Sequence, residues 1–281
     1  MSKTLYISDL DGTLLNQNAK VSEFTAHTLN ELIAKGMLFS VASARSIISA
    51  KGLLDEVNMN LPGIFMNGVL LCDTKTKITV DFCPLENNAA KALIEAFSQN
   101  GRPPFVFSFT GDKVQGGYNS SISVEYKQLM TAADVDFYEN RKHKYDRFDR
   151  VDEYLVNNPI YVNGFGNEQV IGSVYDMASK IEGVSAEKYL DIYTDEWLLE
   201  CHNDSCTKAS RAIEMKKATK ADRLVVFGDN YNDMGMMSVA DVAVAVDNAP
   251  DDVKAVAHVI IDSNQNDGVA KFLLNEFKKA D

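Results

Sequence analysis

The chain has 281 residues, of which 46% are hydrophobic and 24% charged, a balance typical of a folded globular protein rather than a disordered one. This length suits one large domain or two of ordinary size. The 28 basic and 40 acidic residues give a net charge of −12, which argues against a nucleic-acid-binding protein, whose binding face is basic. An anionic substrate is compatible with this charge, because a bound metal and a few local cations can reverse the sign within one cleft.

Short apolar runs alternate with amphipathic segments at both ends of the chain. In chain order, they predict strands at residues 5–8, 37–42 and 64–66, helices at 22–35 and 46–57, and a hairpin over 69–82. The C-terminal part predicts strands at 224–227, 242–246 and 259–261 and helices at 231–238 and 269–279. Strands that alternate with helices predict a parallel sheet, which binds ligands at the carboxyl ends of its strands.

The middle of the chain follows a different pattern. It contains predicted helices at 86–99 and 169–181 and strand candidates at 105–109, 160–163 and 189–193, interrupted by Pro and Gly. This pattern predicts an α+β module at residues 84–194, inserted into a core formed by residues 1–83 and 195–281.

Export and membrane insertion are not expected. No segment approaches the roughly 20 apolar residues of a membrane span, and no apolar stretch of a signal peptide precedes the first strand. The four cysteines, Cys72, Cys83, Cys201 and Cys206, are too sparse for a disulfide scaffold. We therefore expect a cytoplasmic protein with packed or free thiols, and the sequence predicts no particular oligomeric state.

Carboxylates follow two of the predicted strands. Asp9-Leu10-Asp11-Gly12-Thr13 comes directly after the first strand, and Gly228-Asp229-Asn230-Tyr231-Asn232-Asp233 follows the strand at 224–227. Each cluster alone could be an acidic turn or a helix cap. Carboxylates that meet at one edge of a sheet repel each other unless a divalent cation lies between them, and oxygen ligands favour Mg²⁺ over zinc. Together the clusters predict a Mg²⁺ site.

Two further positions suit an anion. Ser43-Ala44-Arg45 follows the second strand, where a hydroxyl and backbone N–H groups can hold a phosphate. Lys208 begins a predicted helix and could add a positive charge. The alternatives are a plain helix cap and a solvated lysine.

With these residues the sequence resembles the haloacid dehalogenase (HAD) superfamily, specifically its Cof-type (IIB) phosphatases. Four family motifs occur in order at residues 9–14, Ser43, Lys208 and residues 228–233, with smaller similarities at Asn67-Gly68, 245–250 and 266–270. Ser43 and Lys208 lie 165 positions apart, and the family carries its larger cap between these motifs. The resemblance implies an α/β, Rossmann-like parallel-sheet core with an inserted α+β cap that selects the substrate.

The resemblance also implies a mechanism. Asp9 would be the nucleophile that forms an aspartyl-phosphate, and Asp11 the general acid and then the base. Mg²⁺ would be held by Asp9, the backbone carbonyl of Asp11, and Asp229. Phosphate would be bound by Ser43, Lys208, Asn232 and the backbone amides of Leu10 and Ala44, with Arg45, Asn67 and Asp233 in support. The expected activity is hydrolysis of a small phosphorylated metabolite, a sugar phosphate or a phosphorylated cofactor.

Other functions fit the same residues. The alternatives are a phosphotransferase or phosphomutase on the same scaffold, and a non-catalytic ligand-binding protein. The chain also departs from the family at three glycines, where it has Ala44, Ala209 and Asp247.

Several features of the inserted module could contact the leaving group. The basic segment 141–147 could attract a second anionic group, although a solvated face is the simpler interpretation. Residues 112–118 are a candidate flexible loop. Tyr193 and Trp197 could stack on a ring, although we expect Trp197 to pack in the core.

Overall fold

The structure is a computed structural model that describes residues 3–46, 49–50, 52–102, 104–110, 113–119, 146–148, 158–191 and 196–278. The chain divides into two compact units: the first is Met1–Asp81 with Cys206–Asp281, and the second is Phe82–Ser205. The inserted unit therefore ends at residue 205, whereas the sequence pattern predicted its end at residue 194. The reason is that strand β11 (Glu196–Asn203) pairs with β9 (Pro159–Gly166) and β10 (Val184–Asp191) of the inserted unit.

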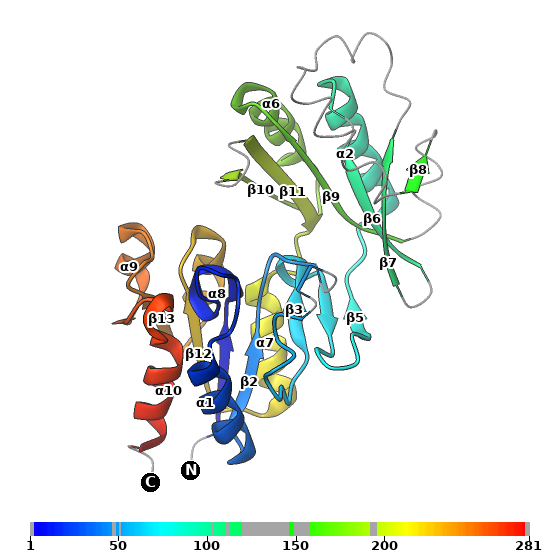
Figure 1. The fold of residues 1–281 in the computed structure, drawn as a ribbon. Coiled ribbons are helices and arrows are strands. Elements are labelled where there is room, and N and C mark those ends of the chain that lie inside the picture. The colour runs from blue at the N-terminus through cyan, green and yellow to red at the C-terminus, as the bar shows by residue number, and fades with distance from the viewer. Residues whose placement is uncertain are drawn as a thin grey trace. The chain divides into compact units, whose positions relative to one another are not determined.

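The first unit is built on a parallel sheet of five strands in the order β14-β13-β12-β1-β2 (Figure 1). The strands are β1 (Thr4–Ser8), β2 (Leu38–Val41), β12 (Arg223–Gly228), β13 (Val242–Val246) and β14 (Val259–Ile261). The central strands are buried along most of their length, as expected for a parallel sheet covered on both faces. The predicted α/β core is confirmed.

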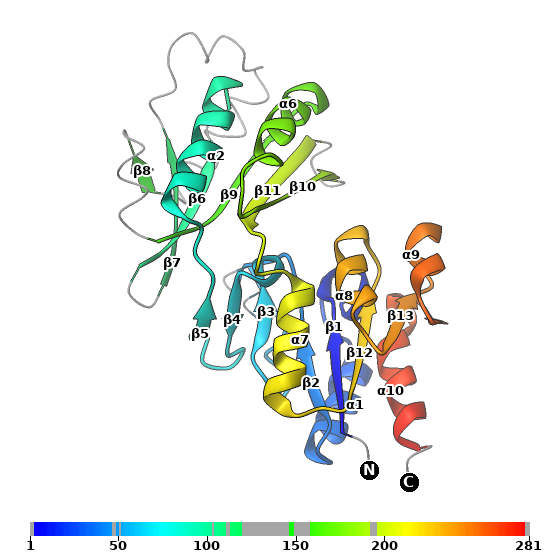
Figure 2. The ribbon, with the colours of Figure 1, turned by 180° about the vertical axis from the view of Figure 1, so that it is seen from behind.

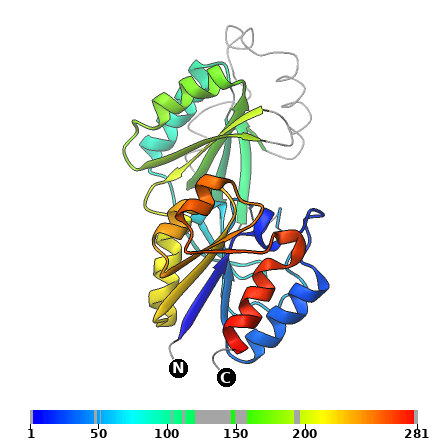
Figure 3. The same cartoon turned by 90° about the vertical axis from the view of Figure 1, so that its left-hand side faces the viewer.

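Helices cover both faces of this sheet. They are α1 (Glu23–Ala34), α7 (Lys208–Thr219), α8 (Met234–Ser238), α9 (Asp251–Val256) and α10 (Gly268–Lys278). Figure 3 shows α1 and α10 on one side of the sheet and α7 on the other. A buried cluster that includes Leu5, Val226 and Met236 joins the sheet to α7 and α8. The Ser22 side chain accepts a hydrogen bond from the Thr25 N–H and caps α1, as the sequence predicts.

A second sheet follows β2 along the chain. It consists of β3 (Gly63–Phe65), β4 (Leu70–Cys72) and β5 (Thr79–Phe82), in that order, and its strands β3 and β4 pair antiparallel. The predicted hairpin is confirmed. The helix predicted at 46–57 is wrong for the described part of that range, which forms successive turns. Gly52 has φ +86°, a left-handed conformation that interrupts an α-helix.

The second unit has a sheet of six strands, and Figure 2 shows them in the order β10-β11-β9-β6-β7-β8. The remaining strands are β6 (Phe105–Thr110), β7 (Lys113–Asn119), β8 (Asp146–Phe148), β9 (Pro159–Gly166) and β10 (Val184–Asp191). Helices α2 (Asn87–Gln99) and α6 (Glu168–Ala178) pack together against β9 and β11. Phe97, Val106 and Ile171 belong to the core between them. The predicted α+β module is confirmed.

Three sequence expectations in this unit have different outcomes. The predicted loop at 112–118 is wrong for residues 113–118, which belong to β7 and pair antiparallel with β6. Two adjacent glycines, at 116 and 117, lower the strand propensity of that segment, so only the pairing reveals the strand. Trp197 packs against the core, as expected. Residues 141–145 of the basic segment and Tyr193 lie outside the described residues.

The cysteines fall into two classes. Cys72 and Cys201 are buried free thiols, as expected. Cys83 and Cys206 are disulfide-bonded, which corrects the expectation of free thiols there. Whether a disulfide can form depends on the distance between the Cβ atoms of two cysteines and on the directions of their side chains. The spacing of cysteines in the sequence does not reveal this geometry. Among the described residues, no helix has the length and apolarity needed to cross a membrane.

Candidate active site

The register of the parallel sheet brings distant residues to one edge. Ser8 at the end of β1 pairs with Val41 of β2 and with Phe227 of β12. The next backbone bonds continue this register, since the Asp9 N–H donates to the Phe227 carbonyl at 2.9 Å. The segments that begin at Asp9, Ser43 and Asp229 therefore leave their strands side by side, at the edge where α/β proteins bind ligands.

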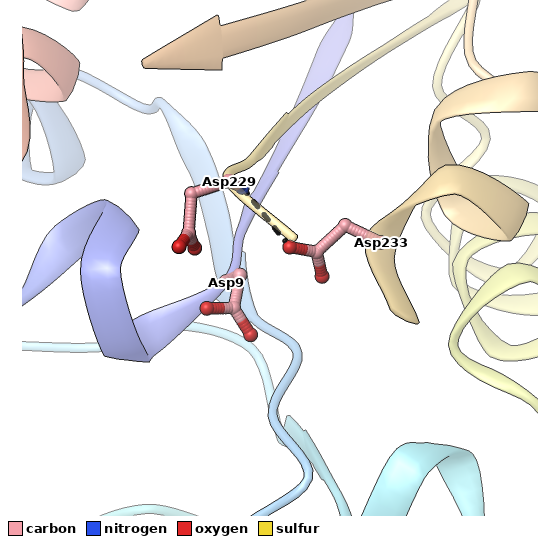
Figure 4. Close-up of side chains that lie close together, drawn as sticks. All are labelled: Asp9, Asp229 and Asp233. Atoms are coloured by element: carbon pink, nitrogen blue, oxygen red, sulfur yellow. Dashed lines mark hydrogen bonds between the residues drawn. The ribbon is translucent and has the colours of Figure 1, made fainter. Parts of the chain in front are cut away.

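Three carboxylates meet at this edge. One oxygen from each of Asp9, Asp229 and Asp233 lies within 4.8 Å of the others. Figure 4 shows the three side chains converging from the end of β1, the end of β12 and the short 3-10 helix Tyr231–Asp233. Asp233 Oδ2 accepts hydrogen bonds from the Asp229 N–H at 3.1 Å and the Asn230 N–H at 3.2 Å. Asp9 and Asp233 are buried and Asp229 is half-buried.

Lys208 provides the positive charge of this cluster. Its Nζ donates to Asp9 Oδ1 and to Asp233 Oδ1, both at 2.8 Å, and its side chain is 3% exposed. A reciprocal cap between Thr207 and Ser210 starts α7 at this lysine. Although burial lowers the pKa of Lys208, the charges of Asp233 and Asp9 raise it above its usual value. The lysine therefore stays protonated.

Two of these carboxylates, those of Asp9 and Asp229, have raised pKa values. Burial, and then the charge of Asp233, raise the pKa of Asp9 well above its usual value against the effect of Lys208. Burial raises the pKa of Asp229 to about 7, although a hydrogen bond from Thr13 opposes the shift. One ammonium compensates only one of three carboxylates, and a divalent cation would balance the other two. These oxygen donors fit Mg²⁺.

The turn after β1 packs closely against the side chain of Asp229. Gly12 has φ +79°, and a Cβ placed there would lie 2.3 Å from Asp229 Oδ2, so glycine meets both a conformational and a steric requirement. Thr13 Oγ1 donates to Asp229 Oδ1 at 2.6 Å. Thr13 lies inside the first motif, but the motif alone does not predict this contact with Asp229.

The side chain of Asp11 has a different partner. Arg45 donates from Nε to Asp11 Oδ2 at 2.6 Å and from Nη2 to Asp11 Oδ1 at 2.7 Å. Both side chains are partly exposed, at 31% for Arg45 and 43% for Asp11. The acidic cluster contains Asp9, Asp229 and Asp233 and not the Asp11 carboxylate, because the chain turns after Asp9 instead of continuing as a strand.

The candidate phosphate-binding residues Leu10, Ser43, Ala44 and Asn232 lie in the segments that follow β1, β2 and β12. Ser43 is buried, and its Oγ accepts from the Arg45 N–H at 3.1 Å. Its carbonyl accepts from the N–H of Asn67 at 3.1 Å, and Asn67 is buried with φ +54°. Leu10 is buried in the turn after Asp9, Ala44 is half-buried in the loop after β2, and Asn232 is half-buried in the short 3-10 helix Tyr231–Asp233.

The three departures from the family glycines are compatible with this backbone. Ala44, Ala209 and Asp247 are not among the described non-glycine residues with positive φ. A side chain at these positions therefore meets no penalty of the left-handed region.

Comparisons with known proteins agree with the fold and the motifs. A family model for haloacid dehalogenase-like hydrolases matches residues 6–273. The chain is 23% identical to the 5-amino-6-(5-phospho-D-ribitylamino)uracil phosphatase YitU of Bacillus subtilis, over 96% of each protein. It is also 23% identical to the pyridoxal phosphate phosphatase YbhA of Escherichia coli, over 97% of this chain and 98% of that protein.

Solved structures share the whole fold. A HAD phosphatase from Bacteroides thetaiotaomicron superposes with a TM-score of 0.77 at 18% identity, covering 98% of this chain and 95% of that one. The subclass IIB sugar phosphatase BT4131 gives a TM-score of 0.71 at 18% identity, with 98% of each chain covered. The resemblance noted in the motifs is confirmed by a family match over nearly the full length, and the chain belongs to the haloacid dehalogenase-like hydrolases.

Proposed function

We propose that this protein is a Mg²⁺-dependent phosphatase of small phosphorylated metabolites that works through an aspartyl-phosphate on Asp9. The observation that carries the proposal is a buried lysine held by Asp9 and Asp233, beside a third carboxylate at the ligand-binding edge of the sheet. The similarity to phosphatases of 5-amino-6-(5-phospho-D-ribitylamino)uracil and of pyridoxal phosphate, and to a sugar phosphatase with this fold, supports the substrate class.

In the first step Asp9 acts as nucleophile. Its Oδ1 accepts the hydrogen bond from Lys208, which leaves Oδ2 to attack phosphorus. The new bond from Asp9 to phosphorus forms as the ester bond to the leaving group breaks, and Asp11 transfers a proton to the leaving alkoxide. Lys208 offsets the negative charge on the transferred group.

In the second step Asp11 acts as a base. It takes a proton from water, whose oxygen attacks phosphorus while the bond to Asp9 breaks and inorganic phosphate is released. Asp9, Asp229 and the main-chain carbonyl of Asp11 would hold the metal. Bound there, Mg²⁺ would reduce repulsion between the carboxylate nucleophile and the phosphate.

The remaining residues would hold the phosphoryl group. The Ser43 oxygen accepts a hydrogen bond from the Arg45 N–H, and the Ser43 hydroxyl can donate its proton in a hydrogen bond to the phosphoryl group. The N–H groups of Leu10 and Ala44 and the amide of Asn232 would complete this cradle. Asn67 supports the Ser43 backbone and Asp233 orients Lys208. We propose that the inserted unit acts as the cap that recognises the leaving group.

Phosphate release from p-nitrophenyl phosphate and from a panel of sugar phosphates and phosphorylated cofactors tests the function. With Mg²⁺ present we expect turnover, and EDTA should lower it about 10²-fold or more, since the metal supplies several kcal/mol to the transition state. Added Mg²⁺ should restore the rate. No release from any member of the panel would contradict a phosphatase. Transfer to a second sugar in place of water would indicate the phosphotransferase.

Arg45 is expected to act through Asp11. Its two hydrogen bonds fix the Asp11 carboxylate, so Arg45→Ala should misplace the general acid. An alkoxide leaving group needs a proton, whereas p-nitrophenolate leaves readily without one. We therefore expect Arg45→Ala to lower kcat about tenfold more for an alkyl phosphate substrate than for p-nitrophenyl phosphate, a fraction of the total effect of general acid catalysis.

The comparison variants for this prediction are Asp11→Asn and Arg223→Ala. Asp11→Asn should show the same dependence on the leaving group. Arg223 pairs with Glu276 at 2.9 Å and is similarly exposed, so its loss should affect both substrates alike. Equal losses on both substrates in Arg45→Ala would show that Arg45 does not act through the general acid.

A further inference from the structure

Two asparagine side chains outside the acidic cluster connect three loops at the ligand-binding edge of the first unit. Asn248 follows β13, and its Nδ2 donates to the Gly12 carbonyl at 2.8 Å. Asn264 follows β14, and its Nδ2 donates to the Leu15 carbonyl at 2.8 Å. The two are linked, because the Asn264 N–H donates to Asn248 Oδ1 at 3.0 Å. The turn after β1 is therefore anchored at both ends.

The anchored segment, residues 12–15, carries a contact to the acidic cluster. Thr13 lies between the two anchored carbonyls, and its hydroxyl donates to Asp229 at 2.6 Å. Gly12 lies so close to Asp229 that it has no room for a Cβ. A shift of this turn by a fraction of an ångström would therefore change the hydrogen bond from Thr13 and the close packing of Gly12, which together orient the Asp229 carboxylate.

We propose that Asn248 and Asn264 are positioning residues of the metal site, which hold residues 12–15 so that Thr13 orients Asp229 for Mg²⁺. The inference rests on the proposed function, in which Asp229 is a Mg²⁺ ligand. Groups that orient metal ligands from outside the coordination sphere contribute about 10- to 100-fold to metal affinity. The two amides act through Gly12, Leu15 and Thr13 and contact neither the substrate nor the metal.

The test is Mg²⁺ binding by the full chain, measured by isothermal titration calorimetry without substrate. Asn248→Ala and Asn264→Ala should each raise the Kd for Mg²⁺ about tenfold or more. Asn248→Asp keeps an acceptor for the Asn264 N–H but cannot donate to the Gly12 carbonyl, so it should lose affinity as well. Because the two residues form one connection, the double alanine variant should lose less affinity than the product of the single losses.

Asn30 provides a matched control. Its side chain makes the same kind of exposed bridge, with Nδ2 donating to the Glu56 carbonyl at 2.8 Å and Oδ1 accepting from the Asn58 N–H at 2.6 Å. Asn30→Ala removes equivalent hydrogen bonds from a different part of the unit. Asn30→Ala should leave the Kd for Mg²⁺ unchanged. If the Kd rose only because the protein was destabilised, it would rise in Asn30→Ala as well as in Asn248→Ala.

The outcomes separate this inference from the proposed function. A wild-type protein that binds Mg²⁺ together with an Asn248→Ala variant of equal affinity overturns the inference alone, and so does an equal loss in Asn30→Ala. If Asn248→Ala does not fold, Asn264→Ala, which releases the Leu15 end, tests the inference in the same way. A wild-type protein that takes up no Mg²⁺ contradicts the proposed function, and the inference fails with it.

Discussion

Asp9→Asn is expected to lower kcat for phosphomonoester hydrolysis about 10⁴-fold or more, because loss of a nucleophile removes the covalent route. The amide has nearly the shape of the carboxylate. It also removes one charge from a cluster in which burial and the charge of Asp233 already disfavour ionised Asp9. The fold should therefore survive, with Lys208 still paired to Asp233. Steady-state kinetics and thermal unfolding together measure both expectations.

Asp247→Asn is the control for this variant. Asp247 is 72% exposed and lies 3.6 Å from Lys254, so its neutralisation should change neither activity nor stability appreciably. Near-wild-type turnover in Asp9→Asn would eliminate Asp9 as the nucleophile. Covalent labelling offers a second measurement, since rapid acid quench of the wild type, and not of Asp9→Asn, should trap phosphate on the protein.

Lys208→Met is expected to cost about 3–5 kcal/mol of unfolding free energy at pH 8 without metal, because it leaves buried carboxylates without their partner. The loss should shrink at lower pH. The pKa of Asp9 is raised in the folded state, so the folded protein binds a proton there more readily than the unfolded chain. The stability associated with Asp9 is therefore complete below its unfolded pKa and declines as pH rises through the folded pKa.

Urea unfolding in EDTA at pH 5 and pH 8 measures this effect. Lys216→Met is a matched control on the same helix, since Lys216 pairs with Asp241 at 2.6 Å but is partly exposed, and surface pairs contribute about 0–1 kcal/mol. A Lys208→Met variant as stable as Lys216→Met at pH 8 would contradict the view that the lysine compensates buried charge. Activity should also fall sharply, since Lys208 contacts the nucleophile.

Much of the fold followed from local patterns. The strand β13 occupies the predicted range and is buried along most of its length, because a buried parallel strand is a short, continuous apolar run between polar segments. The edge strand β14 also occupies its predicted range, although its residues are exposed or half-buried. Two segments did not follow their pattern. Gly52 interrupts the helix predicted at 46–57, and the glycine-rich segment at 113–119 forms a strand through pairing with β6, because tertiary contacts override weak local propensity.

The residue types of the candidate site were determined by the sequence alone: two acidic clusters, each placed after a strand, predicted carboxylates at one sheet edge because all carboxyl ends of a parallel sheet lie together. Only the tertiary structure decided the partners. Lys208 lies 199 positions from Asp9, and Arg45 lies 34 positions from Asp11. Hydrogen bonds reach about 3 Å, so side-chain pairing depends on strand register and on how each turn directs its side chains, neither of which is encoded in residue spacing.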